Sequence, residues 1–180
     1  MSELKNVVWR YRVALWSIAV GLFAFACDLG GSFYEHLVID PAWPDNPSLI
    51  QPEHGGVDRK RFWIPLHGLI TLALLVAVAS SWTDRPARKR VLAGAGFYVV
   101  LRVWTFAYFV PLGLRFESAG RVLSPDLASL AEEWVSLSLL RLPLVAGAAV
   151  ALLLALRRLL QISPQRERAA LETRRAAHAG

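Results

Sequence analysis

Four long apolar runs dominate the pattern of hydrophobic and polar positions along the chain. They cover residues 13–33, 62–82, 91–112 and 134–156. Each is close to the roughly 20 helical residues that cross the hydrocarbon core of a bilayer. The runs are continuously apolar and lack the alternation of a β-barrel, so helices are the expected form. The pattern therefore predicts an all-α fold: a polytopic membrane protein with four transmembrane helices packed as a bundle.

The segments around these runs complete the predicted organisation. Residues 1–161 are expected to form one transmembrane domain, and residues 162–180, rich in alanine and arginine, a basic cytoplasmic tail. The connections 34–61 and 113–133 are long, and prolines interrupt the first of them. We expect two long irregular loops there, because proline breaks regular elements. Trp43 is expected at the headgroup layer, where tryptophan is enriched.

The composition agrees with a membrane protein. Of 180 residues, 55% are hydrophobic and 19% are charged, whereas soluble domains have about 45–50% and about 25%. This hydrophobicity excludes intrinsic disorder for most of the chain. The single cysteine, Cys27, excludes an intrachain disulfide framework and a cysteine-rich zinc site.

The net charge of +6 is interpreted as a topology signal. The basic residues flank apolar runs instead of forming a patch interleaved with aromatic residues, so no nucleic-acid partner is expected. Thirteen lysines and arginines lie on the side of the two termini and of the 83–90 connection, and five lie on the other side. Cytoplasmic segments carry the excess of basic residues in membrane proteins. Both termini are therefore predicted to be cytoplasmic, with the protein integral to the cell membrane and the two long loops outside.

Ionisable residues within the apolar runs are the strongest indication of function. A charge in the hydrocarbon is costly, so it normally faces the interior of the bundle and marks a site. Asp28, His67, Arg102 and Arg141 lie in the outer halves of their runs, and Glu35 lies just beyond the first run. The inner halves consist of leucine, valine, alanine and similar residues. A polar pocket is therefore expected in the outer half of the bundle.

Helical spacing places aromatic side chains beside these charges. Tyr98, Arg102 and Thr105 follow the i, i+4, i+7 spacing of one helix face, and residues 134, 138 and 141 repeat it. The pocket is thus expected to accept a flat, lipophilic molecule. The residues predicted to contact it are Asp28, Tyr34, Trp63, Tyr98, Trp104, Tyr108, Glu133 and Trp134.

Four of the polar residues are candidates for catalysis. Arg102 and Arg141 would stabilise a phenolate or enolate, because a fixed cation acts strongly on charge that develops in a low dielectric. His67 or Glu35 would act as the general base. A metal stays open as an alternative, held by Glu35, His67 and Glu132 or Glu133, although the chain has no HExxH motif. No cofactor is assigned.

Short motifs also follow one another in a characteristic order. The first run ends in GGSFYEH (30–36), PAWP (41–44) follows, and FWIPLHG (62–68) opens the second run. The third run ends in YFVP (108–111), and EEWVSLSLLR (132–141) opens the fourth. This layout resembles the anthrone-oxygenase-like family of small four-helix membrane proteins over about residues 10–160. The resemblance implies a compact four-helix bundle and, for a minority of members, an oxygenation of polycyclic phenols that is cofactor-independent or of unknown mechanism.

Two functions fit these observations. The first is a membrane-embedded oxidoreductase or oxygenase that acts on a lipophilic aromatic substrate. The second is a non-catalytic membrane module, either an accessory subunit or a protein that binds a lipid-like or anionic ligand. In a third interpretation the buried charges only neutralise one another and fix the helix register. The partners expected are the lipid bilayer, a lipophilic small molecule, and a second copy or another membrane protein.

Overall fold

The structure is a computed structural model that describes the backbone of residues 2–179 and the side chains of residues 6–162. The α-helices are α1 (Ser2–Tyr34), α2 (Lys60–Ser80), α3 (Arg85–Trp104), α4 (Val110–Glu117), α5 (Pro125–Ser138) and α6 (Leu142–Ala179). Short π- or 3₁₀-helical segments are η1 (Glu35–Ile39), η2 (Pro47–Ile50), η3 (Pro52–His54), η4 (Thr105–Phe109) and η5 (Leu139–Arg141). The predicted tail after residue 162 lies outside the residues whose side chains are described.

The elements join into four continuous helical rods. Each contains a stretch long and apolar enough to cross a membrane, and these stretches are Asn6–Ile39, Lys60–Ser80, Arg85–Glu117 and Pro125–Ile162. Three of them are longer than the apolar runs, because polar helical turns extend the rods at their ends. The predicted all-α fold with four candidate membrane-spanning helices is therefore confirmed.

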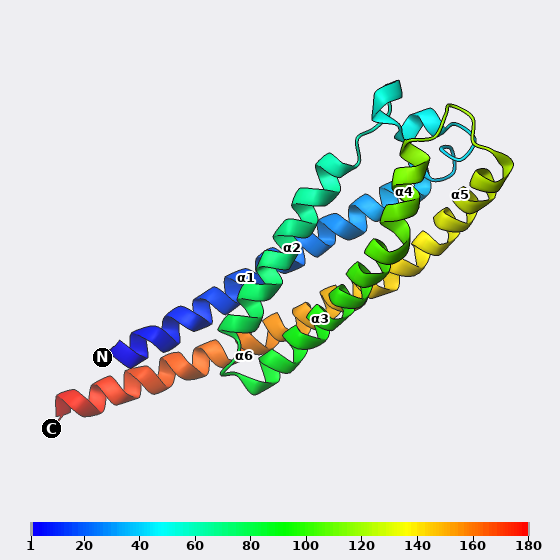
Figure 1. Cartoon of the computed structure of the whole chain (residues 1–180). Coiled ribbons are helices and arrows are strands. Elements are labelled where there is room, and N and C mark those ends of the chain that lie inside the picture. Colours follow the sequence, from blue (N-terminus) through cyan, green and yellow to red (C-terminus); the bar gives the residue numbers. More distant parts are fainter. Residues whose placement is uncertain (1, 180) are drawn as a thin grey trace.

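The rods pack unevenly. Helix α6 lies along both α1 and α3, and α1 also packs against α2, whereas α2 and α3 make little contact beyond the short turn that joins them. Gly94 allows the close approach of α3 to α6, because a Cβ there would come within 3.2 Å of the Ala148 carbonyl oxygen. At the end where α1 begins, the Tyr11 hydroxyl donates a hydrogen bond to the Leu159 carbonyl at 3.0 Å. Figure 1 shows α1 and α6 side by side there, with the 40–59 loop at the opposite end.

Two of the rods are irregular where a proline follows. Proline has no N–H, and its ring clashes with the carbonyl four residues earlier. The π-helical segment η4 precedes Pro111, and the 3₁₀ segment η5 precedes Pro143. Figure 1 shows α4 continuing α3 with a change of direction at η4. Such interruptions often occur at functional sites.

The end of the molecule remote from the termini is a packed cap with its own core. It is formed by Trp43, Ile50, Phe109, Phe116, Ala131 and Trp134. Trp43, expected at the headgroup layer, is fully buried in this core, so its side chain would not contact headgroups. The expected irregular loop 113–133 is wrong, since α4 runs to residue 117 and α5 starts at residue 125. The 34–61 connection begins with the helical turn η1 and then forms short turns.

Gln51 fixes this connection to the rest of the cap. It is completely buried, and its Nε2 donates to the carbonyls of Phe116 and Ala119, each at 3.0 Å. Gly56 lies so close to the preceding turn that a Cβ would fall 2.1 Å from the Ser48 carbonyl oxygen. The loop is therefore held in one conformation above the helices.

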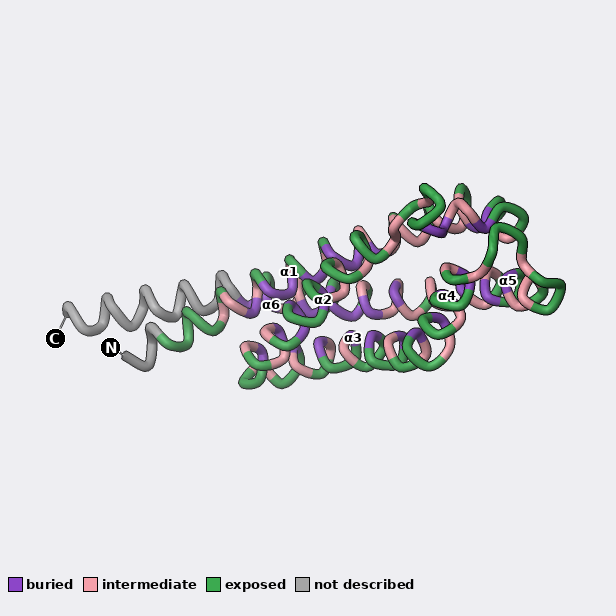
Figure 2. Tube along the Cα trace, turned by 45° about the horizontal axis from the view of Figure 1, so that its top comes forward, coloured by how far each residue is buried: buried purple, intermediate pink, exposed green. Residues whose placement is uncertain are grey.

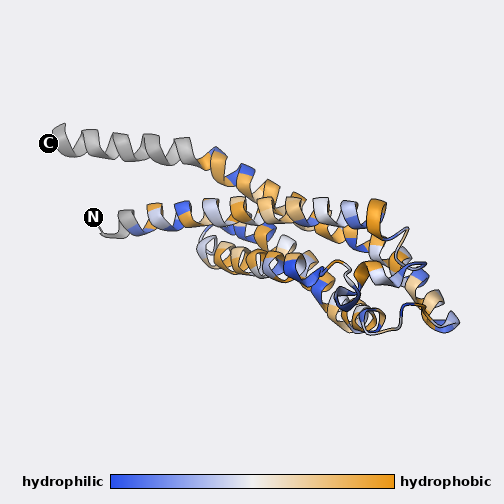
Figure 3. Ribbon diagram, turned by 90° about the horizontal axis from the view of Figure 1, so that it is seen from above, coloured by the Kyte–Doolittle hydropathy of each residue, from blue (hydrophilic) through white to orange (hydrophobic). Residues whose placement is uncertain are grey.

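Large apolar side chains cover the outside of the rods. Trp16 and Phe23 on α1 are each 68% exposed, and Leu75 on α2 is 64% exposed. Figure 2 shows exposed positions along the whole length of α3, and Figure 3 shows hydrophobic residues along all four rods rather than in one stripe. Soluble monomers rarely expose continuous apolar surfaces of this extent. The surface is compatible with a surrounding of lipid.

Candidate functional site

A cavity of about 1160 Å³ lies in the half of the bundle next to the cap. Helices α1 and α6 form its back wall, and α2 and the α3–α4 rod form its sides. Trp134 of α5 closes it toward the cap. The cavity exists because α2 and α3 diverge from their short turn, so that no side chain from a third helix fills the space between them. Its size suits a drug-sized ligand.

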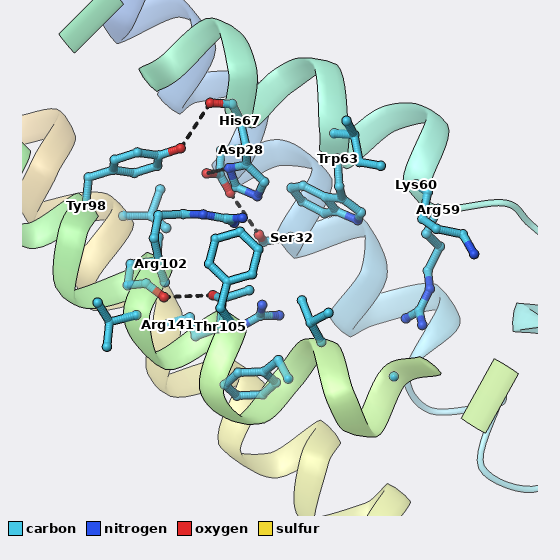
Figure 4. A pocket seen from close by; sticks show the side chains of 18 of the residues that line it. Asp28, Ser32, Arg59, Lys60, Trp63, His67, Tyr98, Arg102, Thr105 and Arg141 are labelled. Atoms are coloured by element: carbon cyan, nitrogen blue, oxygen red, sulfur yellow. Dashed lines mark hydrogen bonds and ion pairs between the residues drawn. The ribbon is translucent and has the colours of Figure 1, made fainter. Parts of the chain in front are cut away.

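Asp28 and His67 face each other inside this cavity (Figure 4). Asp28 is only 3% exposed, and its Oδ1 accepts a long hydrogen bond from the Ser32 hydroxyl at 3.5 Å. Its Oδ2 lies 3.9 Å from His67 Nδ1, too far for a hydrogen bond, and neither atom has another hydrogen-bond partner. Buried polar atoms are normally paired. Asp28 and His67 are therefore the buried polar residues of the cavity whose hydrogen bonding is incomplete.

The His67 ring packs against two aromatic rings, those of Trp63 and Tyr98. It stacks on the Trp63 ring with 5.6 Å between centroids and 20° between planes. Trp63 Nε1 in turn donates to Glu35 Oε1 at 2.8 Å. The backbone carbonyl of His67 accepts the Tyr98 hydroxyl at 3.0 Å, which ties α2 to α3. These contacts fix the orientation of the imidazole toward Asp28.

Three guanidinium groups line the cavity without a direct counter-charge. Arg102 lies over the Phe106 ring at 4.4 Å, Arg141 over the Phe109 ring at 4.3 Å, and Arg59 over the Trp134 ring at 5.5 Å. Among the residues with described side chains, no carboxylate oxygen lies within 4.0 Å of any of the three. Aromatic faces attract cations but do not neutralise them. The cavity therefore offers guanidinium groups that no described carboxylate contacts, although Asp28 and Glu35 also line it.

The cations lie at two depths. Arg102 and Arg141 are close enough to Asp28 to act on it electrostatically. Figure 4 shows Arg102 extending toward Asp28 and His67, whereas Arg59 and Lys60 lie apart from this group, at the start of α2. Lys60 Nζ is paired with Glu117 Oε2 at 2.7 Å and is therefore neutralised. The deeper part of the cavity thus contains two arginines and the Asp28–His67 pair.

Eight of the twelve residues predicted to form a site line this cavity: Asp28, Glu35, Trp63, His67, Tyr98, Arg102, Trp134 and Arg141. The other four do not line it. Tyr34 is exposed on the outside of α1, and Trp104 packs into the cap core beside Phe109. The Tyr108 hydroxyl donates to Glu133 Oε1 at 3.1 Å, and this pair lies at the surface.

The residues proposed as metal ligands are not brought together. Between residues 6 and 162, no group of three His, Cys, Asp or Glu side chains is close enough to hold a metal ion. Glu35 bonds Trp63, and Glu133 bonds Tyr108 outside the cavity.

Some residues of the site were not predicted from the sequence. Ser32 and Arg59 line the cavity, as do Phe106 and Phe109, which lie beneath the arginines. Phe106 follows Arg102 by four residues, and this spacing is the sequence signal that could have identified it. The packing of Phe109 under Arg141 depends on the approach of two rods, and no local pattern encodes it.

A second polar cluster lies behind the cavity, in the cap. His36 Nδ1 pairs with Asp40 Oδ2 at 2.7 Å, and the Ser138 hydroxyl lies 3.4 Å from the same nitrogen. A hydrolytic triad needs the serine and the carboxylate on different ring nitrogens. Here both use Nδ1, and the Ser138 hydroxyl donates to the Val135 carbonyl at 2.7 Å. Asp40 Oδ1 also accepts Trp43 Nε1 at 3.2 Å, so the cluster anchors the cap.

Comparisons with protein-family models, curated proteins and solved structures find no match to this chain.

Proposed function

We propose that the protein is integral to the cell membrane, with both termini in the cytoplasm. The exposed apolar side chains on all four rods and the excess of basic residues on the side of the termini support this arrangement. The cavity then lies in the outer half of the bilayer, and the cap lies on the outer side of the membrane. The test uses intact cells that express a chain with Cys27→Ala, which removes the native thiol, and Ser118→Cys, which introduces one at the cap. These cells are treated with a cysteine-reactive reagent that does not cross the membrane. Labelling is expected at the cap, and complete protection there would contradict the orientation.

We further propose that the cavity binds a lipophilic molecule with an anionic or phenolic polar end. The observation that carries this proposal is the pair of guanidinium groups, Arg102 and Arg141, which line a mainly apolar cavity without a carboxylate of the described residues in contact with either. Charged groups buried away from water are normally paired. A carboxylate or phenolate would supply that pair, and a hydroxyl could bridge Asp28 and His67.

Equilibrium binding of anthracene-2-carboxylate, a flat fluorescent anion, tests this proposal. The full chain in lipid nanodiscs is titrated, and empty nanodiscs give the background. Arg102→Gln and Arg141→Gln are each expected to weaken binding about 10- to 100-fold, because a hydrogen bond to a charged group contributes about 1.5–3 kcal/mol. Arg115→Gln is the matched control, since Arg115 is exposed and does not line the cavity. Equal affinities in all four chains would refute the proposal.

Catalysis is the second candidate, and the proximity of His67 to Asp28, with 3.9 Å between Nδ1 and Oδ2, favours it. In this proposal His67 takes a proton from the ring CH₂ of an anthrone, and Arg102 and Arg141 stabilise the resulting enolate. Molecular oxygen is the oxidant: one of its atoms becomes the new carbonyl oxygen, and the other leaves as water. The resemblance to anthrone-oxygenase-like proteins supports this choice of substrate.

Oxygen consumption with anthrone separates the two candidates. His67→Gln is expected to abolish turnover while anthracene-2-carboxylate still binds, because the arginines remain. His54→Gln, on the cap surface, serves as the control. If anthrone is not consumed faster than in empty nanodiscs, the protein binds its ligand without oxygenating it, and the enzymatic proposal fails.

A further inference from the structure

The cavity opens sideways between α2 and the α3–α4 rod. The opening is defined by residues that both line the cavity and are exposed at the surface. On α2 these are Lys60, Ile64, Gly68 and Thr71, which share one helix face. On the facing rod they are Val99, Val103, Phe106, Ala107, Val110 and Leu114. We call this opening the window.

A polar contact closes each end of the window. At the cap end, the ion pair between Lys60 and Glu117 joins the start of α2 to the end of α4. At the other end, Thr71 Oγ1 lies 3.0 Å from the Tyr98 hydroxyl and joins α2 to α3. From Lys60 to Thr71 the window is roughly 16 Å long, at about 1.5 Å per helical residue. It is therefore a bounded opening rather than a general separation of the helices.

The chemistry of the window differs from that of the cavity behind it. The two edges of the window, one on α2 and one on the α3–α4 rod, are called its lips. Between the two ends of the window the lips carry apolar side chains such as Ile64 and Val103, which are 67% and 64% exposed. Asp28 on α1 and Arg141 on η5 lie at the back wall, and Arg102 extends toward Asp28 from α3. All the lips belong to helical stretches that are apolar enough to cross a membrane. In a bilayer the window would therefore face lipid tails and not water.

We propose that the ligand is a bilayer-resident amphiphile that enters through this window with its anionic end first. The inference rests on the proposed binding function and deepens it. The anionic end reaches Arg102 and Arg141 in the deeper part of the cavity, and the apolar part lies between the lips. A molecule of this kind reaches the site from the outer leaflet without crossing the cap, which Gln51 and Trp43 hold closed.

A thiol on the back wall makes this route measurable. Ser32→Cys, in a Cys27→Ala chain, changes one atom of a side chain that lines the cavity on α1, opposite the window. Its reaction rate is measured in nanodiscs with N-dodecylmaleimide, which partitions into the bilayer, and with a sulfonated maleimide that stays in water. The same thiol reports both routes of access.

Gly68→Phe narrows the window. A Cβ at Gly68 meets no atom within 4 Å, so the aromatic ring can be accommodated at the lip. Gly96→Phe on α3 is the matched control, because Gly96 is also exposed and equally open but does not line the cavity. Gly68→Phe is expected to slow the reaction of the Ser32→Cys thiol with N-dodecylmaleimide about tenfold or more. The rate with the sulfonated reagent should stay unchanged, because only the lateral route is obstructed. Val103→Trp, on the opposite lip, should have the same effect.

The outcomes separate the route from the site. If both window variants leave the N-dodecylmaleimide rate unchanged, or slow both reagents equally, the lateral route is overturned. Protection of the Ser32→Cys thiol by anthracene-2-carboxylate reports the proposed function independently. If anthracene-2-carboxylate does not protect the thiol in the chain with an unmodified window, both the proposed binding and the lateral route are refuted. If it protects the thiol but the window variants do not selectively slow the reaction with N-dodecylmaleimide, only the lateral route is refuted.

Discussion

Filling the cavity from Gly113 should stabilise the protein and abolish ligand binding at the same time. Gly113 is buried and lines the cavity, yet a Cβ there would meet no atom within 4 Å. In Gly113→Phe, the side chain therefore enters space that no protein atom occupies. Most glycine substitutions at buried sites do the opposite, because a new side chain normally meets its neighbours.

The expected magnitude follows from two contributions. Removing glycine from a helix interior gains about 0.5 kcal/mol, and about ten new dispersion contacts of the ring with the cavity walls gain about 1–2 kcal/mol, since burial from lipid brings no hydrophobic transfer energy. Part of the ring covers polar atoms, so a net gain of about 1–2 kcal/mol is the expected result. By the scaling for soluble proteins of similar size, this corresponds to an increase in melting temperature of about 2–8 °C.

Thermal unfolding and anthracene-2-carboxylate binding are measured on the same nanodisc samples. Gly30→Phe is the control, because Gly30 is exposed on α1, has equally open space and does not line the cavity. The Gly30→Phe variant should gain only the helix-propensity contribution to stability and should keep the affinity of the unsubstituted chain for anthracene-2-carboxylate. A destabilised Gly113→Phe, or one that binds the anion as well as the unsubstituted chain, would show that the cavity is not an open binding site.

Two further predictions concern the cap that closes the site. Gly56→Ala should destabilise the protein by about 2 kcal/mol or more, because the new Cβ would lie 2.1 Å from the Ser48 carbonyl oxygen and the loop would have to move; thermal unfolding measures this loss, and an unchanged melting temperature would contradict the packing described. Gln51→Leu should cost about 2–3 kcal/mol, because two well-formed buried hydrogen bonds to Phe116 and Ala119 are lost at about 1–1.5 kcal/mol each. Hydrogen exchange should then increase in residues 116–120, and Gln51→Glu, which keeps the shape but loses the amide donor, should cost at least as much.

The sequence predicts the rods because their signal is local. A run of twenty apolar residues has one stable form in a bilayer, whatever its neighbours are. The same local logic correctly groups Tyr98 with Arg102 on one face of α3. At the cap it reaches less far: the prolines of residues 34–61 indicate that no long helix forms there, but not that the buried contacts of Gln51 and Trp43 fix the loop in one conformation. Those contacts join positions more than sixty residues apart, and no periodicity along the chain encodes them.

The candidate site divides in the same way. An ionisable residue in an apolar run is conspicuous in the sequence, because its burial in hydrocarbon is costly. Asp28, His67, Arg102 and Arg141 could be selected on this basis, and all four line one cavity. Aromatic residues carry no such signal, because a tryptophan or tyrosine is equally suited to a core, a site or a lipid-facing surface. Trp63 therefore contacts the site while Trp104 packs into the cap, although both lie near charged residues in the sequence.

The remaining interpretation, that the buried charges only neutralise one another, can be weighed against the geometry. Mutual neutralisation requires contact, because an ion pair offsets the cost of burial only when its groups are close and hydrogen-bonded. Asp28 instead accepts a weak hydrogen bond from Ser32 and leaves its other oxygen unpaired, while Arg102 and Arg141 lie against phenylalanine rings. Two cations, Asp28 and a Glu35 carboxylate hydrogen-bonded to Trp63 line a space of this size without an ion pair between them, so they are arranged around something else. A polar ligand end in that space would pair both arginines and Asp28, and this is why the function is best sought there.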